Sequence, residues 1–483
     1  MGPSVEAREH EAQVALATDA SETRAFLTES EREDLPHAFP NVAPYPAVVT
    51  SLREIDPWRA VLLAEAYVTG VRRKALERYR AALQKTPVRL RQEERAVRLD
   101  AIESAVACEP GGARRQALLT EAERLLPDLR EPARALVDAL RDAFGQIDPA
   151  LWQPLGVSDS GADEMLAATD DLLRELDAWV CVPLGIDRAR MTFADRLRTM
   201  VSPSMTSLAP PSTWVDLGAR WATRTGLETS LRRVVDDLRP ASATGHGVAA
   251  LCERAGERSV LAGRSTVAGR GVMDVGGALS VALACAMGRG IAPGVRRGCD
   301  RGLDGVAHAL GRRLHLERRF LQREAAIDAV PRERYMLEAL HAEVLRTRLD
   351  AVLARFGAAI LARAPEPGQR FHEDLTRALA VAPSPAWAIH VATRCFDDGG
   401  WWGGRWGARA LGARCEPRVV ALLRERYDED WFRNPKAGEG VASVFDAMRA
   451  VGVNAWSEAH GGALKVSELA ARFDEAMRDA RRG

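Results

Sequence analysis

The stretch VGGALSVALA, Val275–Ala284, begins with two adjacent glycines and leads into an almost unbroken apolar run that ends at Met287. This run is about half as long as the ~20 residues that a bilayer-crossing helix needs, so we expect a buried core helix over 275–287. Each glycine inside a helix costs on the order of 1 kcal/mol relative to alanine. We therefore expect Gly276 and Gly277 to lie at the start of this helix, or where another backbone packs closely against it.

The residues just before this helix have a different composition. The segment 241–275 is rich in Gly, Ser and Thr and holds short β-branched pieces such as Ser259-Val260-Leu261. This composition predicts a small β segment near residues 255–272. Beyond it, apolar residues recur at three- and four-residue spacing and predict helices over 302–325, 331–362, 368–381, 385–396, 405–427, 436–451 and 466–481.

The first half of the chain also has helical periodicity. Asp56-Pro57 combines a capping side chain with proline at the first helical position and predicts a helix that continues to Lys85. Similar patterns predict helices over 90–107, 113–126, 131–145, 162–178 and 186–200. The sequence thus indicates a mainly α, multi-helical fold with three parts: a flexible, charged and Pro-rich arm (1–48), a helical N-terminal lobe (49–240) and a C-terminal lobe (241–483) that contains the β segment.

The overall composition excludes several classes of protein. Sixty-seven basic residues balance 67 acidic ones, so no net field draws the chain to nucleic acid or to an anionic membrane. The seven cysteines are scattered and never form a CxxC pair, which is typical of reduced thiols in the cytoplasm. We therefore expect a cytoplasmic protein with neither nucleic-acid nor membrane partners.

The C-terminal stretch LLRERYDEDWFRNPKAGEGVASVFDAMRAVG, Leu422–Gly452, resembles the terminal region of bacterial peptidases of the thimet-oligopeptidase family, which are gluzincin metallopeptidases. In these peptidases an acidic-Trp-Phe segment precedes an N-P-x-A-G helix start. The order of a helical half, a small β segment, a central helix and a helical lobe is also similar. The resemblance implies a clam-like helical architecture and a cleft that could receive a peptide or protein partner.

The resemblance also shows what this chain lacks. In the family, a central helix carries HExxH: two histidines on one helical face bind zinc, and the glutamate activates the metal-bound water. By pattern, the histidine positions fall on Gly276 and Ser280, the glutamate position on Gly277, and the third ligand near Asp304. No HExxH occurs anywhere in the sequence. We therefore expect zinc to be absent and the protein to be a catalytically inactive pseudo-peptidase that binds or scaffolds.

Three tryptophans replace the tyrosines that the family tends to place in a substrate-facing segment. Trp401, Trp402 and Trp406 lie in DDGGWWGGRWGARAL, Asp397–Leu411. The phenolic hydroxyls that could stabilise an oxyanion would therefore be absent. These indoles could pack between lobes or form the wall of a binding site for a peptide or partner.

Other candidate sites remain open as alternatives. Asp304, His308 and His315 would share one helix face, so an active metal-dependent peptidase or hydrolase with a relocated site near Asp304 and His308 is one alternative function. A structural assembly component is another. Glu338 and His341 form a single ExxH, whereas di-iron bundles need two. His372-Glu373 is followed by Thr376 where HExxH requires a histidine, and the glycine-rich segment 269–277 has no P-loop order.

Overall fold

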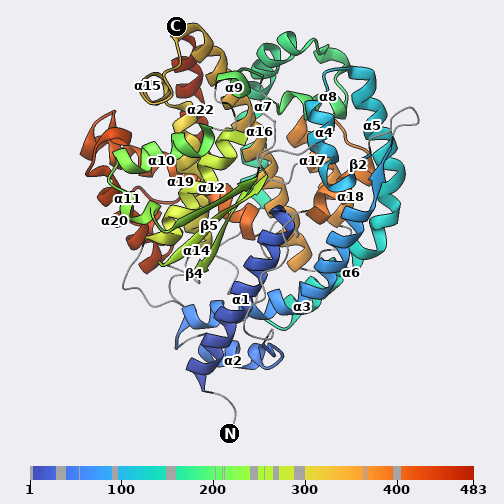
Figure 1. Cartoon of the computed structure of the whole chain (residues 1–483), viewed down its shortest axis with the longest axis vertical. Helices are drawn as coiled ribbons and strands as arrows, with labels where there is room; N and C mark the ends of the chain where they lie inside the picture. Colours follow the sequence, from blue (N-terminus) through green and yellow to red (C-terminus); the bar gives the residue numbers. More distant parts are fainter. Residues whose placement is uncertain are drawn as a thin grey trace.

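The computed structural model describes residues 4–28, 40–53, 55–89, 96–147, 159–201, 203–208, 210, 213–239, 248–254, 256–264, 271–287, 300–362, 364, 367–394 and 404–482. The described chain is mainly α-helical with two small sheets, which confirms the predicted fold class (Figure 1). No described helix combines the length and the apolarity that crossing a bilayer would require.

The described residues of the first half are mostly helical, and among them β1 (Pro87–Val88) and β2 (Val97–Arg98) form a two-stranded ribbon. Asp56 caps α3 as predicted, because its carboxylate accepts a hydrogen bond from the Arg59 backbone N–H. The helices are α1 (Val5–Thr28), α2 (Tyr45–Leu52), α3 (Pro57–Lys85), α4 (Ile102–Cys108), α5 (Gly112–Leu125), α6 (Arg130–Gly145), α7 (Asp159–Cys181), α8 (Phe193–Thr199), α9 (Pro203–Leu208), α10 (Trp214–Arg224) and α11 (Glu228–Leu231).

The three-stranded sheet precedes the central helix. Its order is β3 (Val234–Arg239), β5 (Arg258–Arg264), β4 (Val248–Arg254), with β3 parallel and β4 antiparallel to the central strand β5. Side chains of β5 alternate between two cores: Val260 and Ala262 pack with Ala20 of α1, and Leu261 joins the main core. In the described part of the predicted β segment at 255–272, the structure has the strand β5. Strands β3 and β4 precede it, and Gly271 already begins a helix.

The second half is helical, as predicted. The long helix α16 (Ala329–Leu361) has most of its residues buried and contacts α7, α9, α17, α19 and α22. The other helices are α12 (Gly271–Ala286), α14 (Asp300–Arg313), α15 (Arg318–Arg323), α17 (Pro367–Leu379), α18 (Pro385–Arg394), α19 (Gly404–Tyr427), α20 (Ala437–Val451), α21 (Val453–Ala459) and α22 (Val466–Arg481), with the single 3₁₀ turns η8 (Leu314–Leu316) and η9 (Trp431–Arg433).

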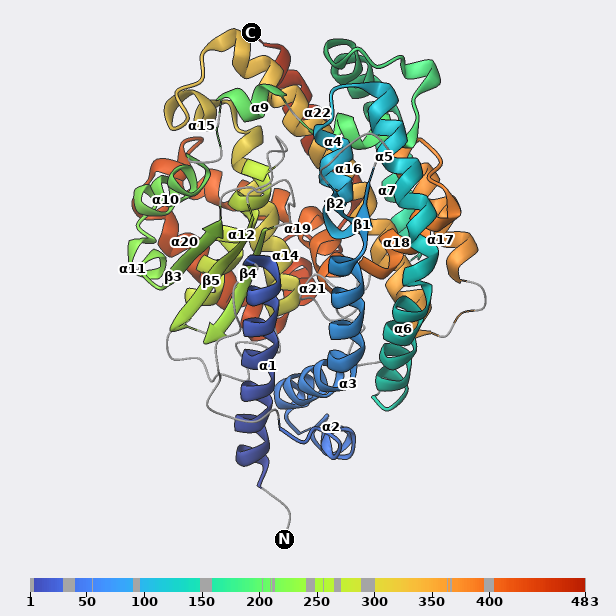
Figure 2. The same cartoon turned by 45° about the vertical axis from the view of Figure 1, so that its right-hand side comes forward.

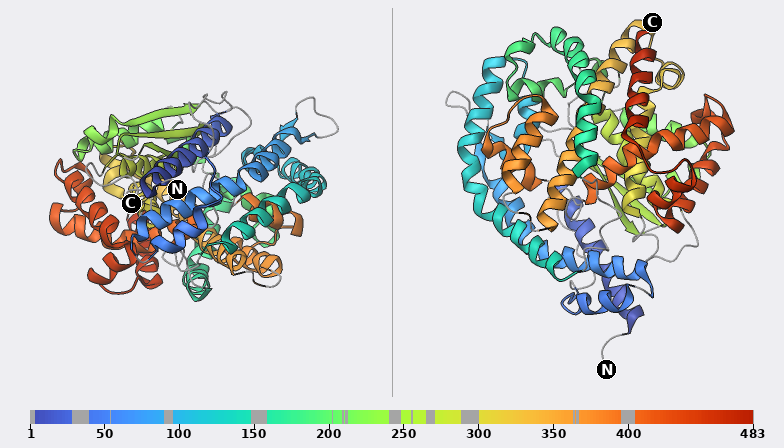
Figure 3. Two further views of the ribbon diagram at one scale, coloured as in Figure 1. Left: turned by 90° about the horizontal axis from the view of Figure 1, so that it is seen from below. Right: turned by 180° about the vertical axis from the view of Figure 1, so that it is seen from behind.

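The helices gather on two sides of α16 (Figures 2 and 3). One side holds the sheet with α10, α12, α14, α19, α20 and α21, and the other holds α4, α5, α6, α17 and α18. Helix α1 lies along the sheet, contacting β4 and β5. The main hydrophobic core contains residues from both sides.

Four local expectations differ from the structure. The expected helix 186–200 begins only at Phe193, after a 3₁₀ turn at Arg188–Arg190. Residues 5–28 of the expected flexible arm form helix α1, because Ala12 and Ala15 bury fully against the core and Arg24 forms an ion pair with Asp237 of β3 at 2.6 Å. The expected helix 90–107 is instead strand β2 followed by α4, which begins at Ile102. The expected helix 302–325 breaks after Arg313, where the chain turns through η8 into α15.

Cysteine chemistry also differs from the expectation of reduced thiols throughout. Cys181 and Cys415 are free thiols, but Cys285 of α12 is disulfide-bonded. Burial raises the pKa of the Cys181 thiol to about 11, so this cysteine is an inert core residue at neutral pH.

Candidate functional site

Helices α12 and α14 touch backbone to backbone at two glycines. A Cβ added at Gly311 would lie 2.2 Å from the carbonyl oxygen of Gly276, and one added at Gly276 would lie 3.2 Å from the carbonyl oxygen of Gly311. Both glycines lie inside their helices. The expectation of a close backbone approach is therefore confirmed, and the alternative that the glycine pair starts the helix is wrong.

The face of α12 that carries the predicted motif positions is covered by side chains of α14 and η8. A Cβ on Gly277 would lie 2.8 Å from Nε2 of His308, and one on Gly276 would lie 3.2 Å from Nε2 of His315. Ser280 is buried, and its hydroxyl oxygen has no hydrogen-bond partner among the described residues. The two histidines thus occupy the space into which larger side chains at 276 and 277 would project.

Arg312 lies at the centre of this packed region. Its Nε donates to Oε2 of Glu343 on α16 at 2.6 Å, and its Nη1 donates to Oδ1 of Asp274 on α12 at 2.5 Å. The guanidinium is buried, and burial alone would lower its pKa, but the charges of Glu343 and Asp274 outweigh that effect and hold the pKa above its usual value. Arg312 is therefore a fixed cation that links α12, α14 and α16.

The weak metal candidates do not form a ligand set. His315 lies in η8, beyond the end of α14, so the expected shared helix face is interrupted. Its Nδ1 lies 2.8 Å from the Tyr335 hydroxyl, and burial together with the charge of Arg312 lowers its pKa to about 3. Asp304 is half-buried and His308 is buried. Over the described ranges, no three His, Cys, Asp or Glu side chains are grouped so that they could hold a metal ion.

Glu338 and His341 make separate contacts. Nε2 of His341 lies 2.9 Å from Oδ1 of Asp177, a carboxylate that also pairs with Arg196 at 2.5 Å. The carboxylate of Glu338 instead accepts two hydrogen bonds from Ser204, one from the Ser204 backbone N–H and one from the Ser204 hydroxyl. Burial lowers the pKa of His341, although the neighbouring carboxylate of Asp177 opposes this shift. The pKa of Asp177 lies below its usual range, because hydrogen bonds from Arg196 and His341 outweigh the effect of burial. The single ExxH therefore serves two helix–helix contacts.

The predicted tryptophan wall is largely outside the described residues. This applies to Trp401 and Trp402, while Trp406 lies in α19 and its side chain is not described. His372 lies on α17, where its Nε2 lies 2.9 Å from the Pro383 carbonyl oxygen. The binding-wall hypothesis thus stays a prediction.

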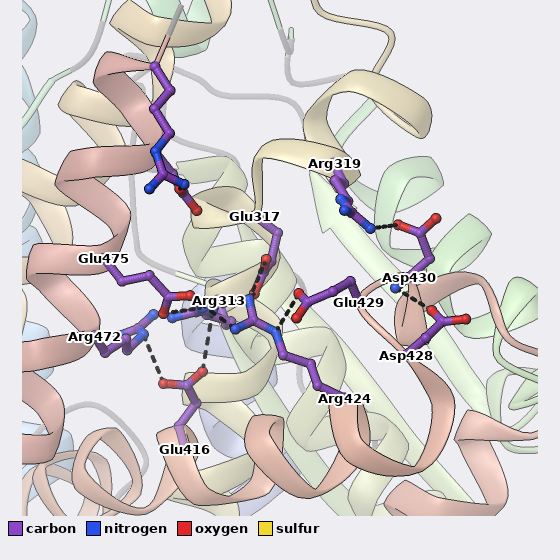
Figure 4. A network of polar contacts seen from close by, with 12 residues as sticks. Arg313, Glu317, Arg319, Glu416, Arg424, Asp428, Glu429, Asp430, Arg472 and Glu475 are labelled. Atoms are coloured by element: carbon purple, nitrogen blue, oxygen red, sulfur yellow. Dashed lines mark hydrogen bonds and ion pairs between the residues drawn. The ribbon is translucent and has the colours of Figure 1, made fainter.

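A second buried ionic network surrounds Arg313, the next residue of α14 (Figure 4). Arg313 forms ion pairs with Glu317 at 2.6 Å and with the fully buried Glu416 of α19 at 3.7 Å. Arg472 of α22 approaches Glu416 to 2.9 Å. Arg424 of α19 also belongs to the network and donates hydrogen bonds to Glu317 and to Glu475 of α22. A fourth carboxylate, that of the exposed Glu429, lies 3.2 Å from Nε of Arg424. Three guanidinium groups and four carboxylates thus connect α14, Glu317 after η8, α19 and α22.

Sequence reasoning missed Arg312 and its two partners. Asp274, Arg312 and Glu343 are more than 30 residues apart from one another, and no motif spacing joins them. The only signal was indirect: charged residues within otherwise apolar helices must find buried partners.

Comparisons with known proteins support the fold. No protein-family model matches the chain, and no curated protein matches it. A solved structure of metallocarboxypeptidase 1 from Trypanosoma cruzi matches with a TM-score of 0.50 and 12% sequence identity, over 98% of this chain and 100% of that one. At this identity the likeness shows the fold alone, which is similar to that of this metallocarboxypeptidase. It does not single out the thimet-oligopeptidase family that the sequence resembles.

Proposed function

We propose that this chain is a pseudo-peptidase: a protein with a peptidase-like fold that does not carry out zinc-dependent hydrolysis and works by binding a peptide or protein. The observation that carries the proposal is the packing of the α12 face at Gly276, Gly277 and Ser280. This is the face on which the resemblance places HExxH, and it is occupied by His308, His315 and the backbone of Gly311.

The chemistry of Arg312 supports the same conclusion. A guanidinium has only N–H donors and no lone pair with which to ligate a metal. Its positive charge also disfavours a second cation beside it in a buried region of low dielectric. Arg312 already pairs with the carboxylates of Asp274 and Glu343, the acidic groups next to this face.

Metal analysis tests the loss of zinc chemistry. We expect purified full-length protein, dialysed against metal-free buffer, to contain far less than one zinc per chain and to leave a peptide library uncleaved. One zinc per chain, together with cleavage that a chelator abolishes, would overturn the proposal. If zinc is found, Asp304→Ala and His308→Ala test for a relocated site, because only the substitution of a metal ligand would abolish zinc binding.

A reconstruction experiment tests the packing argument directly. We expect the triple variant Gly276→His, Gly277→Glu, Ser280→His to fail to bind zinc, because the new side chains would have to displace His308, His315 and α14. Stoichiometric zinc in a folded triple variant would show that the face is open.

The binding role needs its own measurement. We expect saturable binding of fluorescent peptides by the full chain in the absence of added metal. If the protein neither cleaves nor binds peptides, this result would instead favour a role as a structural assembly component.

A further inference from the structure

An open pocket with a volume of about 800 Å³ lies on the outer side of α10, between this helix and the segment that follows η9. Besides Ala219 and Pro435, the residues that line it have polar or charged side chains. They are Thr213, Asp216, Arg220, Thr223 and Arg224 from α10 and its preceding residue, and Arg433 from η9. The pocket is separate from the region around Arg312.

The amphipathic pattern of α10 places these residues at the surface. Trp214, Leu217 and Trp221 are buried, and α10 packs against α12 through Gly218, where an added Cβ would lie 2.4 Å from the Leu279 side chain. Asp216, Arg220, Thr223 and Arg224 therefore lie on the opposite, exposed face. The same helix thus supports the core on one face and presents two arginines one turn apart on the other.

One buried residue, Glu324, contacts all three arginines. Glu324 follows α15, and its side chain is only 4% exposed. Nε of Arg433 lies 2.9 Å from Oε1 of Glu324, and Nε of Arg224 lies 4.0 Å from Oε2. Nη1 of Arg220 donates to the Glu324 backbone carbonyl at 2.9 Å. Glu324 thus fixes two guanidinium groups through its carboxylate and a third through its backbone carbonyl.

The pocket keeps an excess of positive charge and of hydrogen-bond donors. Three guanidinium groups face two carboxylates, those of Asp216 and Glu324. Each guanidinium has five N–H groups, and the contacts with Glu324 engage few of them. Arg224 is 59% exposed and Arg433 is 39% exposed, so the other N–H groups remain accessible to a ligand.

We propose that this pocket binds the oxyanion group of a small molecule, a phosphate or a carboxylate, through Arg220, Arg224 and Arg433. Arginine forks match both groups with paired N–H donors, and pre-positioning by Glu324 reduces the side-chain entropy lost on binding. Because the pocket is open to solvent, binding should weaken as the ionic strength rises. The proposal does not depend on the loss of peptidase activity.

Calorimetric titration of the full chain tests the proposal. The probes are inorganic phosphate and malonate, titrated at constant ionic strength, so that the two arms distinguish tetrahedral from planar oxyanions. We expect saturable one-site binding of at least one probe, weakened about 10-fold or more by Arg224→Gln, the typical effect of losing a charge-assisted pair. Arg224 makes the longest contact with Glu324, so this variant should fold normally.

Arg232→Gln is the matched control. Arg232 is 76% exposed, lies just after α11 and pairs with Glu228, outside the pocket. We expect this variant to bind the probe as the unmodified chain does. Absence of saturable binding by both probes, or equal weakening by Arg224→Gln and Arg232→Gln, would overturn the proposal.

Discussion

Two neighbouring residues of α14 point into different buried environments. Arg312 links α12 and α16 through Asp274 and Glu343, whereas Arg313 joins the network of Glu317, Glu416, Arg424, Arg472 and Glu475 (Figure 4). The Arg313 network connects α14, α19 and α22 through several pairs of guanidinium groups and carboxylates. The Arg312 region occupies the face where the resemblance places a zinc motif. Consecutive residues on one helix can thus contribute to two different buried ionic clusters.

The largest expected effect is in the Arg313 network. We expect Glu416→Ala to lower the free energy of unfolding by about 3–5 kcal/mol, because it leaves Arg313 and Arg472 buried beside each other without their shared carboxylate. Urea denaturation measures this change. Asp171→Ala, which breaks the exposed pair of Arg174 and Asp171, should cost less than about 1 kcal/mol. Similar losses in both variants would show that burial of Glu416 does not matter.

The Arg312 region should be somewhat more tolerant. We expect Arg312→Met to cost about 3 kcal/mol, because Glu343 loses its buried cation while Asp274 remains partly exposed to water. Adding Glu343→Gln should recover part of this loss, since it removes the unpaired charge. If the double variant is as unstable as the sum of the two single variants, the two residues are not coupled.

A smaller effect tests the contact between α12 and α14. We expect Gly311→Ala to cost about 1–3 kcal/mol, because its methyl group would overlap the Gly276 carbonyl oxygen. Gly368→Ala in α17 is the control: its added methyl group would meet nothing within 4 Å, so alanine should be neutral or stabilising by up to about 1 kcal/mol. Thermal unfolding compares the two, and equal melting temperatures would argue against a tight crossing.

The smallest effect is a pH dependence that arises from His315. Its folded-state pKa of about 3 lies below the usual 6.5, so between these values the unfolded chain binds a proton that the folded chain does not. Stability is therefore undiminished above pH 6.5 and falls as the pH decreases toward 3, by up to about 1.4 kcal/mol per pH unit. Urea denaturation at pH 7.5 and pH 5.5 should show a smaller difference for His315→Gln than for the unmodified chain. An unchanged difference would exclude His315 as the source.

The elements predicted best are those defined by local sequence. The expected helix 466–481 coincides with α22, and the expected helix 405–427 differs from α19 by one residue. Helix α1 was missed because its charged residues look solvated in sequence, yet Arg24 pairs with Asp237, more than 200 residues away. Helix α10, and with it the arginine pocket, was not predicted. Its short amphipathic pattern lies between prolines and the strand β3.

The sequence by itself determined that this is a mainly helical chain without HExxH, because periodicity, caps and motif spacing are properties of neighbouring residues. Only the tertiary structure decided what fills the space beside Gly276 and Gly277. His308 and Arg312 reach that space from another helix, and Arg312 is held there by a carboxylate of a third. Contacts between residues so far apart in the chain depend on how the helices pack.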